Sequence, residues 1–129
     1  MPKVSVILPC YNGSLWIDDA IKSVLRQTYN DFELIIVDDG STDNSRDVIE
    51  QYLYDDRVHY IYQSNRGFSA AVNRGIREST GRLIAFIGQD DIWLPNKLKI
   101  QVSYFNKRED IGLLHSDHFL INENGKVIG

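Results

Sequence analysis

Two pairs of adjacent aspartates, Asp38–Asp39 and Asp90–Asp91, are the residues of this sequence whose types and spacing best suit chemistry. Each pair follows a run of mostly apolar residues, where a strand would end. Adjacent carboxylates repel each other, so a turn, a divalent cation or a phosphorylated ligand must offset that repulsion. Carboxylate oxygens are hard ligands suited to Mg²⁺ or Mn²⁺. Such an ion would neutralise a diphosphate and make a nucleoside diphosphate a better leaving group.

The first pair could bind a nucleoside. An ionised carboxylate only accepts hydrogen bonds, so Asp38 or Asp39 could receive the N–H of a base such as uracil, or the hydroxyls of a ribose. Ser41, Thr42 and Asp43 can cap the helix that follows, which would leave the pair available. The alternative is ordinary turn chemistry, because Asp, Gly and Ser also cap exposed N–H groups and start helices.

The second pair lies four to five residues before Pro95, and proline is favoured at the first position of a helix. That spacing is too long for either carboxylate to cap the helix directly, which favours a metal or ligand contact. The alternative is a solvated acidic loop. Trp93, which follows the pair, is more often a packing residue than one that stacks on a ligand.

The segment "NRGFSAAVNRG", residues 65–75, combines glycine, small side chains and arginines. Gly67 precedes a predicted helix, so a ligand could approach the backbone and the helix N-terminus closely. Arg66 and Arg74 could then contact phosphate. The alternative is a small-residue helix packed tightly on a sheet, with its arginines in solvent.

Composition limits the class of protein. The 129 residues carry a net charge of −4 and are 43% hydrophobic, which is typical of one soluble domain and not of a nucleic-acid binder. The single cysteine, Cys10, excludes an internal disulfide and favours a reducing compartment, where we expect an inert buried thiol. His59, His115 and His118 have no spacing that builds a metal site or a triad, so we expect structural roles for them.

The sequence also predicts where the protein resides. The N-terminal "MPKVSVILP" lacks the apolar length and cleavage region of a signal peptide. No segment approaches the roughly 20 apolar residues of a membrane span. We therefore expect a cytoplasmic protein, which could still dock on a membrane surface.

Strand and helix patterns alternate along the chain. Apolar, β-branched runs predict strands at residues 4–9, 33–39, 82–88 and 111–116, and a shorter alternating run predicts one nearer an edge at 58–63. Apolar residues at helical spacing predict helices within residues 14–28, 43–53, 68–80 and 95–105. The tail predicts a hairpin that turns at Asn124–Gly125. This order predicts an α/β protein with three layers, α/β/α, and a mostly parallel twisted sheet.

The polar motifs gather at the ends of these predicted strands. In an open parallel sheet, ligands bind outside the carboxyl ends of the strands. The first strand runs into "PCYNGS", where Tyr11 and Asn12 could flank a base or form a turn. The second runs into "DDGSTDNS" and the fourth into "GQDD". We therefore expect the two aspartate pairs to open onto the same edge of the sheet.

Together these segments resemble the nucleotide-sugar-binding N-terminal domain of family 2 glycosyltransferases, which has the Rossmann-like GT-A fold. The matching stretches are "PKVSVILPCYNGSLWIDDAIKSVLRQTYNDFELIIVDDGSTDNS", "NRGFSAAVNRGI" and "GRLIAFIGQDDIWLPNKL". They occur in the family's order and cover nearly the whole chain. The resemblance implies transfer of a sugar from a UDP- or dTDP-sugar, with inversion and with Mg²⁺ or Mn²⁺, to the hydroxyl of a glycan or lipid-linked acceptor in cell-envelope polysaccharide synthesis.

The resemblance also implies roles for particular residues. The loop at Pro9, Cys10 and Tyr11 would lie against the nucleoside, and Asp39 would accept the base N–H. The acidic motif of the family falls on Asp90 and Asp91, which would hold the metal. The implied nucleotide-binding residues are Pro9, Tyr11, Asp38, Asp39, Arg66, Gly67, Asn73 and Asp90.

Two departures from the family pattern are visible. Many members carry a further aspartate at the position of Gly88, so one carboxylate is missing here. Family members usually run well past 200 residues, and their later part supplies the acceptor site and a catalytic acid residue that acts as base. We therefore expect residues 1–129 to form a single donor-binding domain without the acceptor-binding portion, with the catalytic base beyond Gly129. Uncovered apolar surface in the C-terminal region would then favour homo-oligomers.

Two alternative functions remain at this stage. Length and alternation fit a receiver-like signalling domain. However, a receiver needs an acidic pair after the first strand, where this chain has Cys10 and Tyr11, and a lysine after the fifth, where it has His115 and Ser116. The other alternative is a non-catalytic module that binds nucleotide or protein partners.

Overall fold

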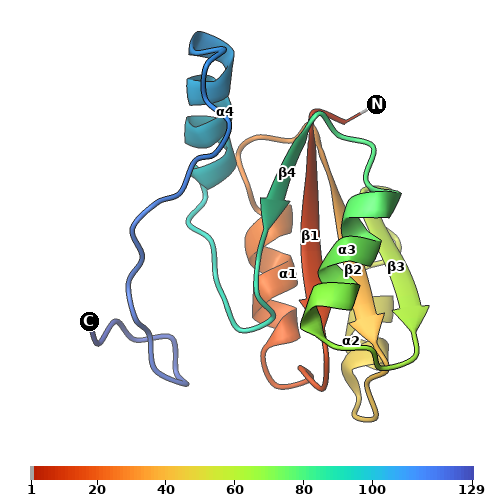
Figure 1. Cartoon of the computed structure of the whole chain (residues 1–129). Helices are drawn as coiled ribbons and strands as arrows, with labels where there is room; N and C mark the ends of the chain where they lie inside the picture. The colour runs from red at the N-terminus through yellow and green to blue at the C-terminus, as the bar shows by residue number, and fades with distance from the viewer. Residues whose placement is uncertain (1) are drawn as a thin grey trace. The chain divides into compact units, whose positions relative to one another are not determined.

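The protein contains a four-stranded parallel sheet. The computed structural model describes residues 2–129, and the chain divides after Lys99 into two compact units. The strands of the first unit are β1 (Val4–Cys10), β2 (Phe32–Asp39), β3 (Val58–Gln63) and β4 (Leu83–Phe86). Their order in the sheet is β3-β2-β1-β4, and every neighbouring pair is parallel. All four strands therefore end at one edge of the sheet (Figure 1).

Helices cover both faces of this sheet. They are α1 (Ile17–Leu25), α2 (Ser45–Glu50) and α3 (Phe68–Glu78), while α4 (Lys97–Lys107) runs across the boundary between the two units. In Figure 1, α3 lies in front of β1 and β2, and α1 and α2 lie behind the sheet. The predicted α/β/α layering and parallel sheet are therefore confirmed.

The central strands follow from their apolar sequences. Every residue of β1 and β2 is buried, as continuous β-branched runs in the middle of a parallel sheet predict. The close fit of α3 depends on Gly75, because a Cβ there would lie 2.5 Å from Cγ2 of Ile7 in β1. A glycine inside the helix therefore allows it to approach the sheet closely.

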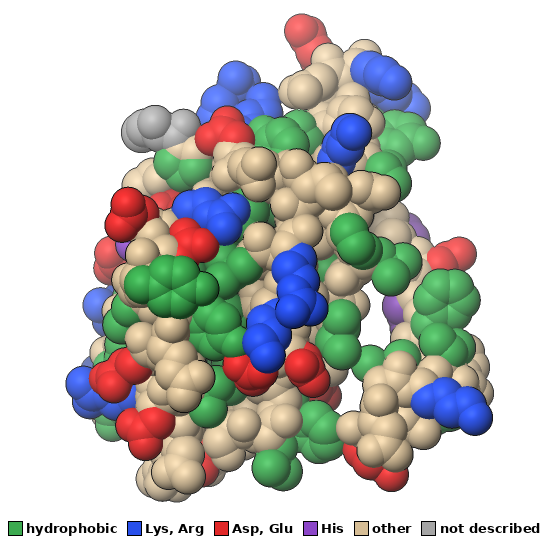
Figure 2. All heavy atoms as spheres, turned by 180° about the vertical axis from the view of Figure 1, so that it is seen from behind, with side chains coloured by type: hydrophobic (Ala, Val, Ile, Leu, Met, Phe, Trp, Pro, Cys, Tyr) green, Lys and Arg blue, Asp and Glu red, His purple; other side chains and the backbone are tan. Residues whose placement is uncertain are grey.

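Charged side chains of both signs lie on the surface formed by α1 and α2, behind the sheet. Lys22 pairs with Asp18 in α1, and Arg46 pairs with Glu50 in α2, each at 2.8 Å. Such exposed pairs add little stability. Figure 2 shows this side of the molecule, where blue and red side chains are interspersed with hydrophobic ones. Among residues 2–129, no helix combines the length and apolar character needed to cross a bilayer.

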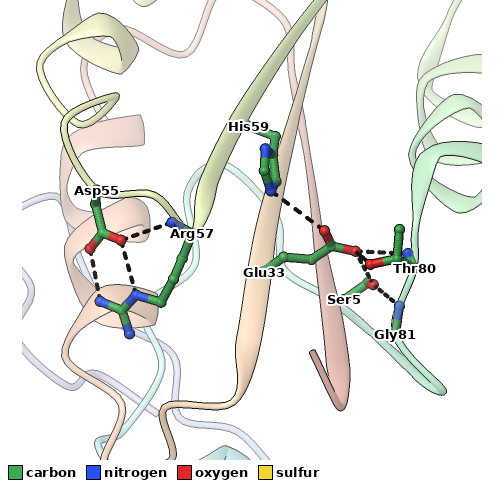
Figure 3. Close-up of polar contacts among 7 residues, drawn as sticks. All are labelled: Ser5, Glu33, Asp55, Arg57, His59, Thr80 and Gly81. Carbon is green, nitrogen blue, oxygen red and sulfur yellow. Dashed lines mark hydrogen bonds and ion pairs between the residues drawn. The ribbon is translucent and has the colours of Figure 1, made fainter. Parts of the chain in front are cut away.

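A polar cluster ties the amino ends of the strands together (Figure 3). Oε1 of Glu33 accepts hydrogen bonds from Ser5 Oγ at 2.6 Å, and from the backbone N and Oγ1 of Thr80 at 2.8 and 2.9 Å. Nε2 of His59 lies 3.5 Å from the other oxygen, Oε2. Burial would raise the pKa of Glu33, but these hydrogen bonds and the nearby histidine outweigh it and lower the pKa. His59 therefore has the structural role expected of it.

Part of the C-terminal prediction is wrong. Residues 111–116 belong to no strand or bridge among the described residues 2–129, so the fifth strand predicted there is absent from that part of the chain. The predicted hairpin is present in the second unit as one antiparallel bridge between Ile121 and Val127. Gly125 occupies its turn with φ +79°, a conformation that favours glycine.

Candidate functional site

The loops after β1 and β2 are hydrogen-bonded to each other. Oδ1 of Asn12 accepts the backbone N–H of Thr42 at 2.8 Å, and the Asn12 backbone N–H donates to Ser41 Oγ at 3.0 Å. The next residue, Gly13, donates its N–H to Ser45 Oγ at 2.9 Å. Asn12 has φ +48°, a conformation that asparagine tolerates better than most residues. These bonds hold the two loops as one surface.

Asp43 strengthens the same junction. Its carboxylate accepts the backbone N–H of Ser14 at 3.0 Å, and the backbone N–H and hydroxyl of Ser45 at 2.9 and 2.6 Å. Burial alone would raise the pKa of Asp43, but these hydrogen bonds lower it to about 2. Asp43 is therefore ionised at neutral pH and accepts hydrogen bonds from the first residue of α2, as its position before the predicted helix suggested.

Asp39 anchors the loop between β3 and α3. Its Oδ1 accepts Gln63 Nε2 at 2.9 Å and the backbone N–H of Arg66 at 2.8 Å, and its Oδ2 accepts the backbone N–H of Gly67 at 2.9 Å. Burial opposes ionisation, but the hydrogen bonds and the Arg66 charge lower the pKa of Asp39. A carboxylate has about four acceptor positions, so the three donors leave one unused on Oδ2 of a residue that is 3% exposed.

Asp38 is buried beside this anchor. Its Oδ1 accepts the backbone N–H of Ser41 at 2.9 Å, and its Oδ2 accepts the Tyr60 hydroxyl at 2.7 Å. Burial and this bond raise the pKa of Tyr60, which remains neutral. Asp38 therefore makes the turn contacts that the sequence left open as its alternative role.

Asp90 and Asp91 are exposed and converge beside Gly88. A Cβ placed on Gly88 would lie 2.8 Å from Oδ2 of Asp91 and 3.4 Å from Oδ1 of Asp90. The backbone N–H of Gly88 also donates to that Asp91 oxygen at 3.1 Å. Within residues 2–129, no three His, Cys, Asp or Glu side chains gather as a metal site. The pair could hold an ion only with further ligands from a bound molecule or water.

Gln89 joins the Asp90–Asp91 turn to the β1 loop. Its Oε1 accepts the backbone N–H of Tyr11 at 2.9 Å, and its Nε2 donates to the Tyr11 carbonyl at 3.1 Å. The side chain passes so close to Gly13 that a Cβ there would lie 2.4 Å from Oε1. Sequence reasoning missed Gln89, because nothing in a glutamine between glycine and aspartate signals a partner 78 residues away.

The remaining residues predicted to bind nucleotide differ in exposure and in position. Pro9 and Cys10 are buried at the end of β1, and burial raises the pKa of the Cys10 thiol. Tyr11 is 48% exposed and stands beside the Gln89 contact. Gly67 lies directly before α3, with φ +98° and open space where a Cβ would be. Asn73 is exposed further along α3, where it lines a depression beside the end of β3.

The sheet order brings these loops to one edge. β1 lies between β2 and β4, so the carboxyl ends of β2 and β4 are about 10 Å apart. The Asp39 anchor and the Asp90–Asp91 turn therefore flank the exposed Tyr11. A parallel sheet with helices on both faces and polar loops gathered at its carboxyl edge defines an α/β protein of the doubly wound class.

Comparison with known proteins identifies the family within that class. The model of glycosyl transferase family 2 matches residues 5–126, so the chain belongs to that family. Membership confirms the resemblance seen in the sequence and makes the receiver-like alternative wrong.

Curated relatives are longer than this chain. An uncharacterized glycosyltransferase of Nostoc sp. is 44% identical over 129 residues, which cover 98% of this chain and 39% of the relative. The UDP-Glc:alpha-D-GlcNAc-diphosphoundecaprenol beta-1,3-glucosyltransferase WfgD of Escherichia coli is 38% identical over 125 residues, which cover 96% of this chain and 49% of WfgD. The chain therefore spans less than half the length of these two relatives.

Solved structures share the fold. S. aureus TarS 1–349 in complex with UDP superposes with a TM-score of 0.79 at 26% identity, covering 83% of this chain and 33% of TarS. The mannosyltransferase PcManGT of Pyrobaculum calidifontis, in complex with GDP-Man and Mn²⁺, superposes with a TM-score of 0.67 at 26% identity, covering 71% of this chain and 28% of that one. The predicted GT-A fold is confirmed.

Proposed function

We propose that the carboxyl edge of β1, β2 and β4 binds a UDP- or dTDP-sugar, and that the whole protein transfers the sugar to an acceptor hydroxyl with inversion. The observation that carries this proposal is the joined surface of three loops, with an acceptor position on Asp39 and an exposed acidic pair beside Gln89. A relative and a solved structure whose names include UDP-linked ligands agree with that donor class.

Each of these residues would contact a different part of the nucleotide. The remaining acceptor position of Asp39 would receive the base N–H, and the exposed ring of Tyr11 would lie against the nucleoside. Gly67 would let the nucleotide approach the start of α3 closely, and the Arg66 side chain would contact it there. Asp90 would face the ribose and the diphosphate. Pro9, Cys10 and Asp38 would support this surface from beneath.

Asp90 and Asp91 would hold Mg²⁺ or Mn²⁺. Their donor set fits such an ion, because two carboxylates near Gly88 leave the other coordination positions to phosphate oxygens and water. When bound, the ion would neutralise the diphosphate leaving group. The Mn²⁺ in the PcManGT complex agrees with this proposal.

The acceptor would be a glycan or a lipid-linked sugar in cell-envelope polysaccharide synthesis. The name of WfgD includes a diphosphoundecaprenol-linked acceptor, which is the basis of the lipid-linked proposal. Such an acceptor would require contact with a membrane surface.

We propose that the catalytic base lies in sequence beyond Gly129 and that the chain self-associates. Sedimentation as a clean monomer at high concentration would count against self-association.

Calorimetric titration of UDP in the presence of Mn²⁺ tests the donor site. We expect Asp91→Ala and Asp39→Asn to weaken UDP binding at least tenfold, since each removes a charged ligand contact worth more than about 1.4 kcal/mol. Asp19→Ala, an exposed carboxylate on α1, is the matched control and should bind as the parent does. Thermal melts would confirm that each variant is folded. No UDP binding by the parent, or equal binding by both site variants, would overturn the donor proposal and favour a non-catalytic interaction module.

A further inference from the structure

A basic depression of about 440 Å³ lies along the edge strand β3 of the first unit. One wall is the end of β3 around Tyr62, and the other is a side of α3. Arg66, Asn73, Arg74 and Arg77 line it, the last three from α3 and Arg66 from two residues before that helix. Arg77 lies about one helical turn from Asn73 and Arg74, which places these three along one side of α3. The opposite side of that helix, with Gly75, packs against β1.

The positive charge of this depression is compensated only in part, by the Asp39 charge near Arg66 and by Glu78 beside Arg74. Arg74 has one carboxylate partner, Glu78, at 3.2 Å on the same helix, and both side chains are partly exposed. The Arg66 and Arg77 guanidinium groups make no ion pair or hydrogen bond within residues 2–129. No Asp or Glu lines the depression. Three arginines thus line one recess in a chain whose net charge is −4, and an anion bound there would offset the repulsion between their charges.

The depression is separate from the proposed metal position. β3 and β4 are the opposite edges of the sheet, three strand spacings or about 14 Å apart. A diphosphate held at Asp90 and Asp91 would therefore not reach Arg74 and Arg77. The two regions meet at Gln63 and Arg66, which both line the depression and both donate to Asp39, Gln63 through its side chain and Arg66 through its backbone N–H.

We propose that this depression is a second anion site, which binds a phosphate monoester or diester. Guanidinium groups form two parallel hydrogen bonds to phosphate oxygens, so two arginines can hold one phosphate with definite geometry. The Asn73 amide and Tyr62 hydroxyl line the same recess and offer neutral donors. Its volume admits a phosphate together with an attached sugar or glycerol. The phosphate could belong to a soluble molecule or to a lipid headgroup.

Titration with inorganic phosphate, in EDTA and without nucleotide, tests the site directly. We expect saturable amide shifts at Tyr62, Ala70 and Arg77 in ¹H–¹⁵N spectra, and at least tenfold weaker binding by the double variant Arg74→Gln/Arg77→Gln. Arg82→Gln, an exposed arginine before β4, is the matched control and should bind as the parent does. Retention of UDP binding by the double variant would separate this site from the donor site. Sodium chloride at equal ionic strength should not reproduce the shifts.

Sedimentation with vesicles distinguishes the two sources of phosphate. Binding to phosphatidylglycerol–phosphatidylcholine vesicles, but not to phosphatidylcholine alone, with loss in the double variant, would identify a lipid headgroup. Phosphate binding without vesicle binding would identify a soluble phosphate ligand. The proposal is overturned if phosphate causes no saturable shift, if the double variant responds as the parent does, or if chloride has the same effect.

Discussion

Gln89 shows how a single uncharged side chain connects the two halves of the proposed donor site. Its amide makes both an acceptor and a donor contact with the backbone of Tyr11, as a neighbouring strand would. The contact holds the Tyr11 backbone beside the turn that carries Asp90 and Asp91. Gln89 is therefore a positioning residue in this account, and it acts on the ligand through the β1 loop.

We expect Gln89→Ala to weaken UDP binding by roughly three- to tenfold, because about 1 kcal/mol of loop-ordering hydrogen bonds is lost. The unfolding free energy should change little, since the contact is exposed. Calorimetry and urea unfolding measure the two quantities. Gln51→Ala, an exposed glutamine after α2, is the control. A loss of stability as large as the loss of affinity would show that Gln89 is merely structural.

The sequence alone predicted those site residues that carry a charge next to an apolar run. Asp39, Asp90 and Asp91 stand out because carboxylates next to apolar runs need a partner, and the structure brings their loops to one edge. The role of Gln89 depends on loop conformation, which its residue type does not encode. The internal partners of Asp38 could not be predicted either, because Tyr60 reaches it from a neighbouring strand.

At the scale of the elements, the buried carboxylate of Glu33 joins neighbouring strands of the sheet, and Gly75 allows α3 to pack closely on the sheet. Glu33 in β2 fastens Ser5 of β1 to Thr80 in the loop before β4. Gly75 lets α3 lie against Ile7. The sequence predicted β1 and β2 from their continuous apolar runs. Residues 111–116 have a similar run but no strand, because apolar character alone does not supply a hydrogen-bonding neighbour.

We expect Glu33→Gln to lower the unfolding free energy at pH 7 by about 1–3 kcal/mol, because the charged acceptor of three hydrogen bonds is lost. The pKa of Glu33 is lowered in the folded state. Its ionisation therefore stabilises the fold above its ordinary pKa of about 4.3, and that contribution is lost as pH falls through the lowered pKa.

Urea unfolding at pH 7 and pH 4 checks this sign. The difference between the parent and Glu33→Gln should be largest at pH 7 and should shrink at and below pH 4. A difference that grows on acidification would contradict the assignment of Glu33 as an ionised anchor.

We expect Gly75→Ala to destabilise the fold by about 1–3 kcal/mol, because the added methyl group would overlap Ile7 and force α3 away from β1. Gly112→Ala is the matched control, since a Cβ at Gly112 meets no atom within 4 Å. Thermal or urea unfolding of both variants provides the comparison. Equal stability of the two would mean that α3 adjusts freely on the sheet.

For the whole molecule, the parallel sheet and its carboxyl edge agree with membership of glycosyl transferase family 2, and we propose that this chain is its donor-binding portion. The family is established by the match over residues 5–126. The chain spans 39% and 49% of the relatives from Nostoc and Escherichia coli. We therefore propose that these residues bind the nucleotide and that acceptor recognition depends on sequence outside them.

Paramagnetic broadening by Mn²⁺ in the presence of UDP tests most directly whether the three loops form one nucleotide site. We predict that UDP with Mg²⁺ shifts the amides of Tyr11, Arg66 and Gly67 together. Replacing Mg²⁺ with Mn²⁺ should then broaden residues 88–91 strongly and the amino ends of the strands very little. Shifts confined to one loop, or Mn²⁺ broadening away from residues 88–91, would contradict the account.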